Sequence, residues 1–368
     1  MPRSQLSVWR HFDIWLSTAV ILLAGYGILM IRSAITGAPA FQGYEQRQLL
    51  FMLAGVLAML ITAGIDYRIL TSAHWYIYAG NILLLLAVLV IGTVNNSANR
   101  WIPLGLLDFQ PSELGRVLIP VSFGQFLAQR QHIIHRFSNT LLSLIYIGVP
   151  IALIYVQPDL GMSILFLFIW FIMLMMAGLP LSHFLTLLLV GVTTAAILYP
   201  NLAEYQQDRI AVFIDPNVDP EQARNIEQAL VSIGSGSWWG KGYLNGTQSQ
   251  LGFLRVQHTD FIFSMITEEM GFFFGSLFVL GLMGFILLRI LRVATISPDP
   301  AGRYLCVGIA GVLFFQTTVS VGMNVRLLPV TGLTLPFVSY GGSALVTLFI
   351  GIGVVQSVLM RHRKQEFG

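Results

Sequence analysis

Long apolar stretches separated by short polar segments make up most of the chain. A helix needs about 20 mostly apolar residues to cross the hydrocarbon core of a bilayer. Ten stretches approach that length: residues 13–33, 48–65, 75–94, 113–129, 139–157, 161–178, 182–199, 261–288, 303–324 and 340–360. The pattern predicts an all-α integral membrane protein with ten transmembrane helices, forming a single polytopic membrane domain over residues 1–368. The eighth stretch is longer than a bilayer needs and contains Gly271 and Gly275, so we expect it to tilt, kink or project.

The composition excludes most other classes of protein. Hydrophobic residues make up 55% of the chain, charged residues only 10%, and the mean hydropathy is +0.75. A soluble domain carries about 25% charged residues because its surface must be solvated. An ordinary soluble enzyme, a disordered protein and a nucleic-acid binder are therefore excluded. The single cysteine, Cys306, excludes a disulfide framework and a cysteine-based metal site, and the apolar stretch after residue 11 is interpreted as a retained signal anchor.

The basic residues predict the orientation in the membrane, because Lys and Arg favour the cytoplasmic side. If both termini are cytoplasmic, the inner segments hold eleven of the 20 Lys and Arg residues, and the short outer segments hold five. The other four lie in residues 200–260, which become a large extracytoplasmic loop before helix 8. Long ordered loops are usually functional, so this loop is a candidate for the site.

Charged residues crowd toward the predicted outer face. They are Arg47, Arg100, Asp108, Glu113, Arg116, Asp159, Arg209, Lys241, Arg255, Asp260 and Arg326. Charges at membrane depth are costly, and each is a functional candidate by default. A mixed cluster with several arginines suits an anionic ligand, and its carboxylates suit proton transfer.

Glu113 and Arg116 are three residues apart at the start of one predicted helix, so their side chains share a face. Ser112 is a plausible N-cap, and Glu113 is in the first turn, where negative charge is favoured. A capped helix start with a local ion pair explains these residues equally well.

Asp260 precedes the long eighth stretch, where an acid serves either as an N-cap or as a general base at the boundary between water and lipid. Glu268 and Glu269 lie about two turns deeper and need partners. We interpret these two as part of a structural polar network. Turn chemistry alone explains Asp159, and a solvated loop charge explains Arg209 equally well.

Two glycine-containing runs have special backbone requirements. The run from Gly234 to Gly242 resembles a phosphate cradle but fails the nucleotide-loop spacing, so we expect a flexible loop with an interfacial pair, Trp238 and Trp239. The run from Pro329 to Ser343 predicts irregular backbone at membrane depth. Such backbone is tolerated only where it packs against protein or lines a wet cavity.

Several motifs together resemble the SEDS family (shape, elongation, division and sporulation proteins) over nearly the whole chain. They are Arg100-Trp101-Ile102, Phe109-Gln110-Pro111-Ser112-Glu113, Gln157-Pro158-Asp159-Leu160-Gly161, Gly240-Lys241-Gly242 with Gly246-Thr247-Gln248, His258-Thr259-Asp260-Phe261-Ile262-Phe263, and the run from Pro329 to Ser343. The resemblance implies ten spans around an outward cavity in a bacterial cytoplasmic membrane. It also implies an enzyme that polymerises lipid II, a disaccharide-pentapeptide on undecaprenyl pyrophosphate, during cell elongation.

The resemblance also implies roles for particular residues. Asp260 matches the family's general base and Glu113 an important glutamate, while Arg116 stands where the family usually has Lys. The residues expected to bind substrate or its pyrophosphate are Arg47, Arg100, Asp159, Gln207, Arg209, Lys241, Thr259 and Ser339. One base and direct displacement imply inversion at the anomeric carbon.

The resemblance further implies no tightly bound cofactor, with room for a divalent cation, Mg²⁺ or Mn²⁺. The implied partners are a class B penicillin-binding protein, lipid II, undecaprenyl-linked glycan and membrane lipid, with no nucleic acid. Two other functions remain open at this point: a lipid II flippase or transporter, and a non-catalytic scaffold for the penicillin-binding protein.

Overall fold

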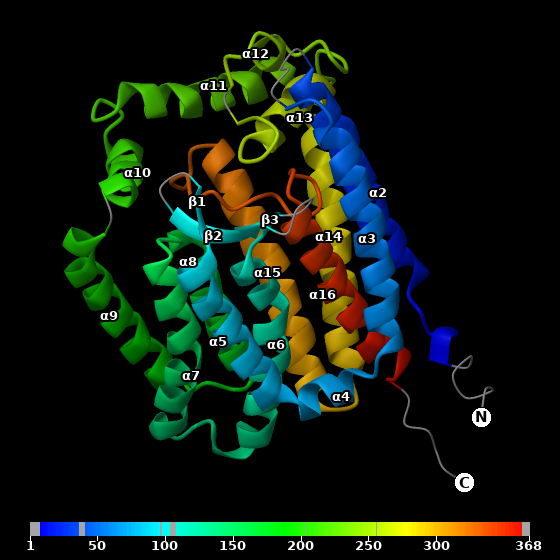
Figure 1. Ribbon diagram of the computed structural model, residues 1–368, viewed down its shortest axis with the longest axis vertical. Helices are drawn as coiled ribbons and strands as arrows, with labels where there is room; N and C mark the ends of the chain where they lie inside the picture. Colours follow the sequence, from blue (N-terminus) through cyan, green and yellow to red (C-terminus); the bar gives the residue numbers. More distant parts are fainter. Residues whose placement is uncertain are drawn as a thin grey trace.

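The computed structural model describes residues 8–36, 41–95, 98–103, 108–202, 204–254 and 256–362. Its long helices are α2 (Ile14–Ile35), α3 (Tyr44–Gly64), α5 (His74–Ile91), α6 (Pro111–Arg130), α7 (Phe137–Val156), α8 (Leu160–Met176), α9 (Leu181–Leu198), α10 (Glu204–Ile214), α11 (Pro220–Gly236), α13 (Ile262–Gly271), α14 (Phe278–Ile296), α15 (Pro300–Asn324) and α16 (Gly342–Met360). Shorter elements are the helices α4 (Tyr67–Ser72), α12 (Thr247–Gln250), η2 (Gln131–Ile133), η3 (Tyr199–Asn201) and η4 (Phe272–Leu277), and the strands β1 (Thr93–Asn95), β2 (Ala98–Pro103) and β3 (Asp108–Phe109). Most of the membrane-length helices run side by side as one bundle (Figure 1).

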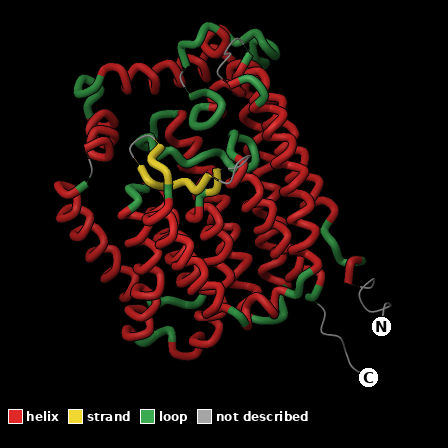
Figure 2. The backbone as a smooth tube through the Cα atoms, in the orientation of Figure 1, coloured by secondary structure: helices red, strands yellow, loops and turns green. Residues whose placement is uncertain are grey.

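Each of the ten predicted stretches coincides with one helix or, for the eighth, with a series of helical segments. Within the described residues, seven spans are long and apolar enough to cross a membrane, and α8 and α9 provide shorter apolar helices. Hence the chain is a mostly helical, multi-pass membrane protein. The strict all-α prediction was wrong in one respect, because β1, β2 and β3 pair antiparallel as a small sheet (Figure 2).

The centre of the bundle is formed by α15 and α16. In the most apolar 18-residue window of each, 78% of residues are buried, against 22% for α3 and for α5. Helix α3 packs closely on α16 because Gly353 has no side chain: a Cβ there would lie 1.9 Å from Thr62 Oγ1. The outer helices therefore present apolar surface to lipid, while α15 and α16 carry the core.

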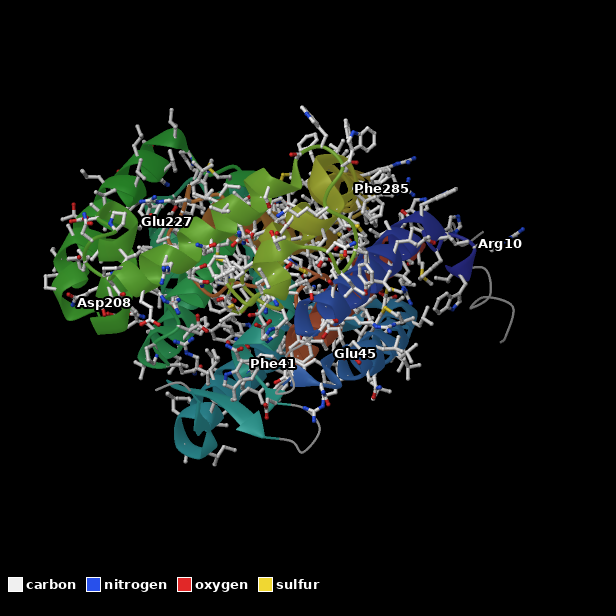
Figure 3. The ribbon with its side chains drawn as sticks, turned by 90° about the horizontal axis from the view of Figure 1, so that it is seen from above. Arg10, Phe41, Glu45, Asp208, Glu227 and Phe285 are labelled. Carbon is white, nitrogen blue, oxygen red and sulfur yellow. The ribbon has the colours of Figure 1, made fainter. Side chains whose placement is uncertain are left out.

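One end of the bundle is tied together by polar contacts of Asp13, at the start of α2. Its carboxylate accepts from Arg289 Nε on α14 at 2.8 Å, and its backbone exchanges two hydrogen bonds with the side chain of Gln356 on α16. The opposite end carries α10, α11 and α12 (Figure 1). Seen from that end, α10 with Asp208 and α11 with Glu227 lie across the bundle (Figure 3).

The eighth predicted stretch is interrupted, as its length and glycines suggested. Helix α13 ends at Gly271, whose φ of 72° is readily adopted only by glycine, and the π-helical turn η4 leads into α14. At the break, the backbone N–H of Phe272 donates to Ser237 O at 2.9 Å, and that of Phe273 donates to Trp238 O at 3.2 Å. The segment after α11 thus accepts hydrogen bonds from backbone N–H groups at the break between α13 and α14.

Candidate functional site

The start of α6 places Glu113 and Arg116 together. Pro111 occupies the first turn, where its fixed φ suits a helix. The N-cap residue is Gln110, so the prediction of Ser112 as the cap was wrong. Glu113 and Arg116 form the ion pair that their spacing predicts.

Arg116 remains only partly bonded despite this pair. Its side chain is 1% exposed, and its Nε and Nη1 atoms have no hydrogen-bond partner within the described part of the chain. A buried guanidinium with open donors is costly. Such donors suit an anionic group that enters from outside the protein.

Asp159 organises a second charged pair at the start of α8. Its Oδ1 atom accepts from Met162 N at 3.1 Å and so caps the helix. Its Oδ2 atom lies 3.6 Å from Arg100 Nη1 and accepts from Gln110 Nε2 at 3.2 Å. Arg100, from strand β2, also donates through Nε to Gln157 O at 2.9 Å. The turn interpretation of Asp159 is therefore incomplete, because the side chain also fixes an arginine.

These pairs face one cavity of about 130 Å³. Its lining residues are Arg100, Trp101, Gln110, Glu113, Arg116, Asp159, Met162, Arg209, Gln316, Thr331, Gly332, Leu333 and Thr334. Three of them are arginines and two are carboxylates, so the cavity carries a formal excess of one positive charge. That balance suits a small anionic ligand.

Arg209 joins the cavity to the segment that follows α15. It reaches from α10 and donates through Nη1 to Val330 O at 3.2 Å, next to Gly332, whose φ is 77°. The run from Pro329 to Ser343 is irregular up to the start of α16, as predicted, and part of it lines the cavity. The interpretation of Arg209 as a solvated loop charge was therefore wrong.

Asp260 is outside the lining of the cavity but is electrostatically coupled to Arg209. Burial raises the pKa of the Asp260 carboxyl, while the charge of Arg209 and a hydrogen bond from Thr259 lower it. Phe261, rather than Asp260, is the N-cap residue of α13, so the capping interpretation was wrong. As a whole residue, Asp260 is partly buried.

Backbone contacts hold the segment around Asp260 in place. Asn324 Nδ2 on α15 donates to Asp260 O at 2.9 Å, and Ser339 Oγ donates to Thr259 O at 2.7 Å. The backbone N–H of Tyr340 donates to His258 O at 3.0 Å. Thr259 and Ser339, both predicted to bind substrate, thus lie beside Asp260 and position its backbone.

Three other predicted binding residues lie away from the cavity lining. The Arg47 guanidinium lies 6.0 Å from the ring of Tyr44, which stacks on Tyr340. Gln207 Nε2, on α10, donates to Leu202 O at 2.9 Å, just before the start of that helix. Lys241 Nζ donates to Glu268 Oε1 at 3.0 Å. Arg255, a candidate from the charge pattern, lies outside the described residues.

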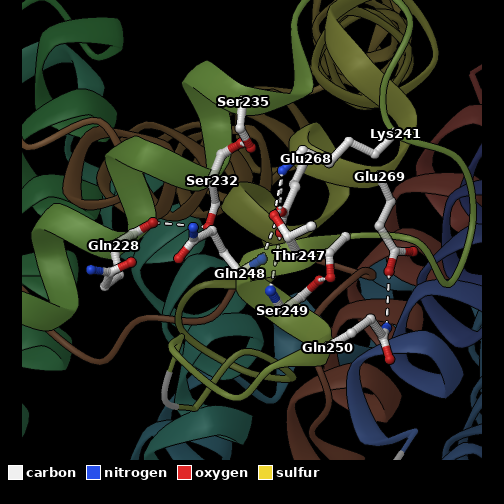
Figure 4. A network of polar contacts seen from close by, with 11 residues as sticks. Gln228, Ser232, Ser235, Lys241, Thr247, Gln248, Ser249, Gln250, Glu268 and Glu269 are labelled. Atoms are coloured by element: carbon white, nitrogen blue, oxygen red, sulfur yellow. Dashed lines mark hydrogen bonds and ion pairs between the residues drawn. The ribbon is translucent and has the colours of Figure 1, made fainter.

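Glu268 and Glu269 form the structural polar network that was predicted (Figure 4). Glu268 accepts from Lys241 and from the backbone N–H groups of Gln248 and Ser249, at 3.0, 2.8 and 3.1 Å. Glu269 accepts from the Ser33 hydroxyl on α2 and from Gln250 Nε2. Both acids therefore connect the segment from Lys241 to Gln250 to the helix bundle.

The run from Gly234 to Gly242 is ordered, so the flexible-loop prediction was wrong. The backbone N–H groups of Lys241 and Gly242 donate to Glu268 O and Glu269 O at 3.0 and 2.8 Å. A Cβ on Gly240 would lie 2.2 Å from Glu269 O, which explains the need for glycine. Trp238 and Trp239 remain exposed, as expected of an interfacial pair.

Sequence reasoning missed some of the cavity residues, notably Gln110 and Gln316. The only sequence signal for Gln316 is an amide within the apolar stretch 303–324. Within the ranges that the structure describes, no group of three or more His, Cys, Asp or Glu side chains could hold a metal ion. The two cavity carboxylates are already paired with arginines, so they do not fit a resident metal.

A bundle of membrane-length helices with a small cationic cavity at one end defines a polytopic membrane protein whose site suits an anionic group. The family model described as "Cell cycle protein", which covers FtsW, RodA and SpoVE, matches residues 14–364. The chain belongs to this family, and the resemblance to SEDS proteins is confirmed.

Relatives match over nearly their whole length. "Peptidoglycan glycosyltransferase MrdB" of Escherichia coli strain K12 is 37% identical over 360 residues, covering 96% of this chain and 95% of the relative. A solved chain from "Structural coordination of polymerization and crosslinking by a peptidoglycan synthase complex" has a TM-score of 0.83 and 31% identity, covering 97% and 99% of the two chains. The "Rod shape determining protein RodA" of Thermus thermophilus has a TM-score of 0.72 and 30% identity, covering 96% and 98%.

Proposed function

We propose that this protein is a peptidoglycan glycosyltransferase that polymerises lipid II into glycan strands during cell elongation. The observation that carries the proposal is the cationic cavity, in which Arg209 both lines the wall and acts on Asp260. The names of the relatives support the same activity and, through the rod-shape protein, the elongation role.

The chemistry follows from these groups. Asp260 takes the proton of an acceptor sugar hydroxyl as that oxygen bonds to the anomeric carbon of the donor. The bond from this carbon to undecaprenyl diphosphate breaks, and the negative charge on the leaving diphosphate is stabilised by Arg100, Arg116 and Arg209. Because the base acts on the acceptor and no enzymic nucleophile is needed, the configuration at the anomeric carbon inverts.

The proposed topology has ten spans, with both termini in the cytoplasm and residues 200–260 outside. Asp13 and Gln356 lie in contact, so the start of α2 and the end of α16 share one side. Arg289 and Arg361 are at that same end, and Lys and Arg favour the cytoplasm. The cavity then opens on the outer face of the cytoplasmic membrane.

The proposed partner is a class B penicillin-binding protein, which crosslinks the strands. One structural relative belongs to a peptidoglycan synthase complex that couples polymerisation to crosslinking. Lipid II is the proposed substrate, and a divalent cation is proposed to arrive on its diphosphate, because the cavity carboxylates do not fit a resident ion.

The test uses the purified full chain with its partner, labelled lipid II and detergent or liposomes. We expect glycan polymer that a muramidase degrades. Movement of lipid II across the liposome membrane without polymer would favour the flippase instead. Absence of both, with the partner still bound, would favour the scaffold.

The pH dependence tests the coupling between Asp260 and Arg209. The carboxyl must be ionised to accept a proton, and burial raises its pKa above the usual aspartate range. As the pH decreases, the rate of polymerisation should therefore begin to fall at a higher pH than it would with a base of ordinary aspartate pKa. Arg209→Gln removes a charge that lowers this pKa, so the acid limb of the kcat/KM profile should move to higher pH.

The matched control is Arg224→Gln, which removes an exposed arginine of α11. Its acid limb should coincide with that of the unaltered protein. An acid limb that stays in place in Arg209→Gln would show that this guanidinium does not act on the base.

A further inference from the structure

The side chain of Gln316 is a fully buried amide. It lies in the middle of α15, and neither Oε1 nor Nε2 is bonded within the part of the chain that the structure describes. Its neighbour Thr317 is satisfied, because the hydroxyl donates to Leu313 O of the same helix at 2.7 Å. Burying an amide without hydrogen bonds lowers the stability of the folded protein. A ligand group that hydrogen-bonds to Gln316 would remove this cost.

Gln316 lines the cationic cavity together with Arg116, which also has open donors within the described residues. Together the two side chains offer three unbonded nitrogen atoms, namely Arg116 Nε and Nη1 and Gln316 Nε2. Gln316 Oε1 adds one acceptor. This set matches a group with several oxygen acceptors and a hydroxyl or water beside them.

The size of the cavity restricts what can enter. Its volume is about 130 Å³, below the roughly 300–1,000 Å³ of pockets that enclose whole drug-sized ligands. A phosphate-sized group fits this volume, which is smaller than a whole disaccharide. The sugars of the substrate must then lie outside the cavity, toward Asp260.

Gln316 also begins a polar row along α15 that leads toward Asp260. Ser320 and Asn324 follow at four-residue intervals, so the three side chains share a helix face. Asn324 Nδ2 donates to Ser320 O and to Asp260 O, at 2.7 and 2.9 Å. One helix thus connects the wall of the cavity to the residue that carries the proposed base.

We propose that Gln316 binds the diphosphate of the lipid-linked donor. Its Nε2–H donates to a non-bridging phosphate oxygen beside Arg116, and its Oε1 accepts from a sugar hydroxyl or a water. This role rests on the proposed function, and it makes Gln316 a substrate-contacting residue that fixes the leaving group relative to Asp260.

The test is Gln316→Met, which keeps the volume and removes both polar atoms. Because a hydrogen bond to a charged group is lost, kcat/KM for labelled lipid II should fall roughly ten- to a hundredfold. The concentration of inorganic pyrophosphate that half-inhibits the enzyme should rise. The thermal midpoint of the protein without substrate should stay or increase, because an unbonded buried amide is removed.

The matched control is Thr317→Val, which removes a polar group from the adjacent position of α15, outside the cavity. It should leave kcat/KM and pyrophosphate inhibition unchanged. If Gln316→Met lowers the thermal midpoint along with the rate, the amide is structural and the proposal is overturned. An unchanged kcat/KM would show that the amide binds only water.

A direct measurement separates this proposal from the proposed function. Inorganic pyrophosphate should raise the thermal midpoint of the full chain, and this shift should be smaller in Gln316→Met than in Thr317→Val. If the protein makes no polymer yet shows this difference, the polymerase proposal fails and the Gln316 site stands. Equal shifts in the two variants would overturn the Gln316 site even in an active polymerase.

Discussion

Asp260→Asn is expected to abolish glycan polymerisation while leaving the protein folded. The substitution keeps the shape of the side chain but removes the carboxylate that accepts the proton, and general bases contribute about 10²- to 10⁴-fold to a rate. The surrounding contacts use the backbone of the segment, through Asn324 and Ser339, and should persist. The measurement is the initial rate of polymer formation from labelled lipid II, with the thermal midpoint as a check on folding.

The control is Asp215→Asn, which changes an exposed acid whose Oδ1 atom accepts hydrogen bonds from nearby Asn217. It should polymerise at the normal rate. If Asp260→Asn retained a rate within a few-fold of the unaltered protein, another group would have to be the base. The cavity would then be better explained by transport or scaffolding.

Arg116→Met is expected to have the second largest effect, because it acts on both activity and stability. Removing one preorganised donor to a developing negative charge costs about 10²- to 10³-fold in rate. The variant also leaves Glu113 buried without its partner. Breaking a buried pair in this way costs about 3–5 kcal/mol, so the thermal midpoint should fall.

A double variant separates these two effects. Glu113→Gln combined with Arg116→Met removes both charges, so much of the lost stability should return, since neutral replacement of a buried pair is often tolerated. Activity should not return, because the cation that faces the diphosphate is still missing. Near-normal polymerisation by the double variant would mean that the pair serves only to hold α6. Arg116→Lys should retain part of the activity, because it keeps the charge but loses the planar fork.

Local sequence patterns determined the helices and the pairing of Glu113 with Arg116. A span must be apolar over its own length, and a three-residue spacing places two side chains on one face wherever the helix lies. The break at Gly271 was visible for the same reason, since the glycine and the excess length are properties of one segment. These features depend on interactions within about 20 residues, so they could be derived without knowing what packs against them.

Which residues line the cavity depends on contacts between segments that are distant in the sequence. Arg209 finds its carbonyl partner 121 residues away, at Val330, and Gln110 binds Asp159, 49 residues away. Lys241 has the same charge as Arg209, yet it binds Glu268 at the helix break instead of entering the cavity. The sequence pattern does not distinguish Lys241 from Arg209, because their different roles depend on which segment the fold places beside each side chain.

The sequence by itself determined that this chain spans a membrane, where its helices run, and which acid precedes the eighth span. Only the tertiary structure decided which charges from distant segments meet, that a small sheet positions Arg100, and that the Gln316 amide is left open, within the described residues, inside a cationic cavity. The physical reason is the sequence distance over which the interactions act. Desolvation and helix periodicity depend on residues that are close in the sequence, whereas the side chains of a binding site become neighbours only when the helices pack.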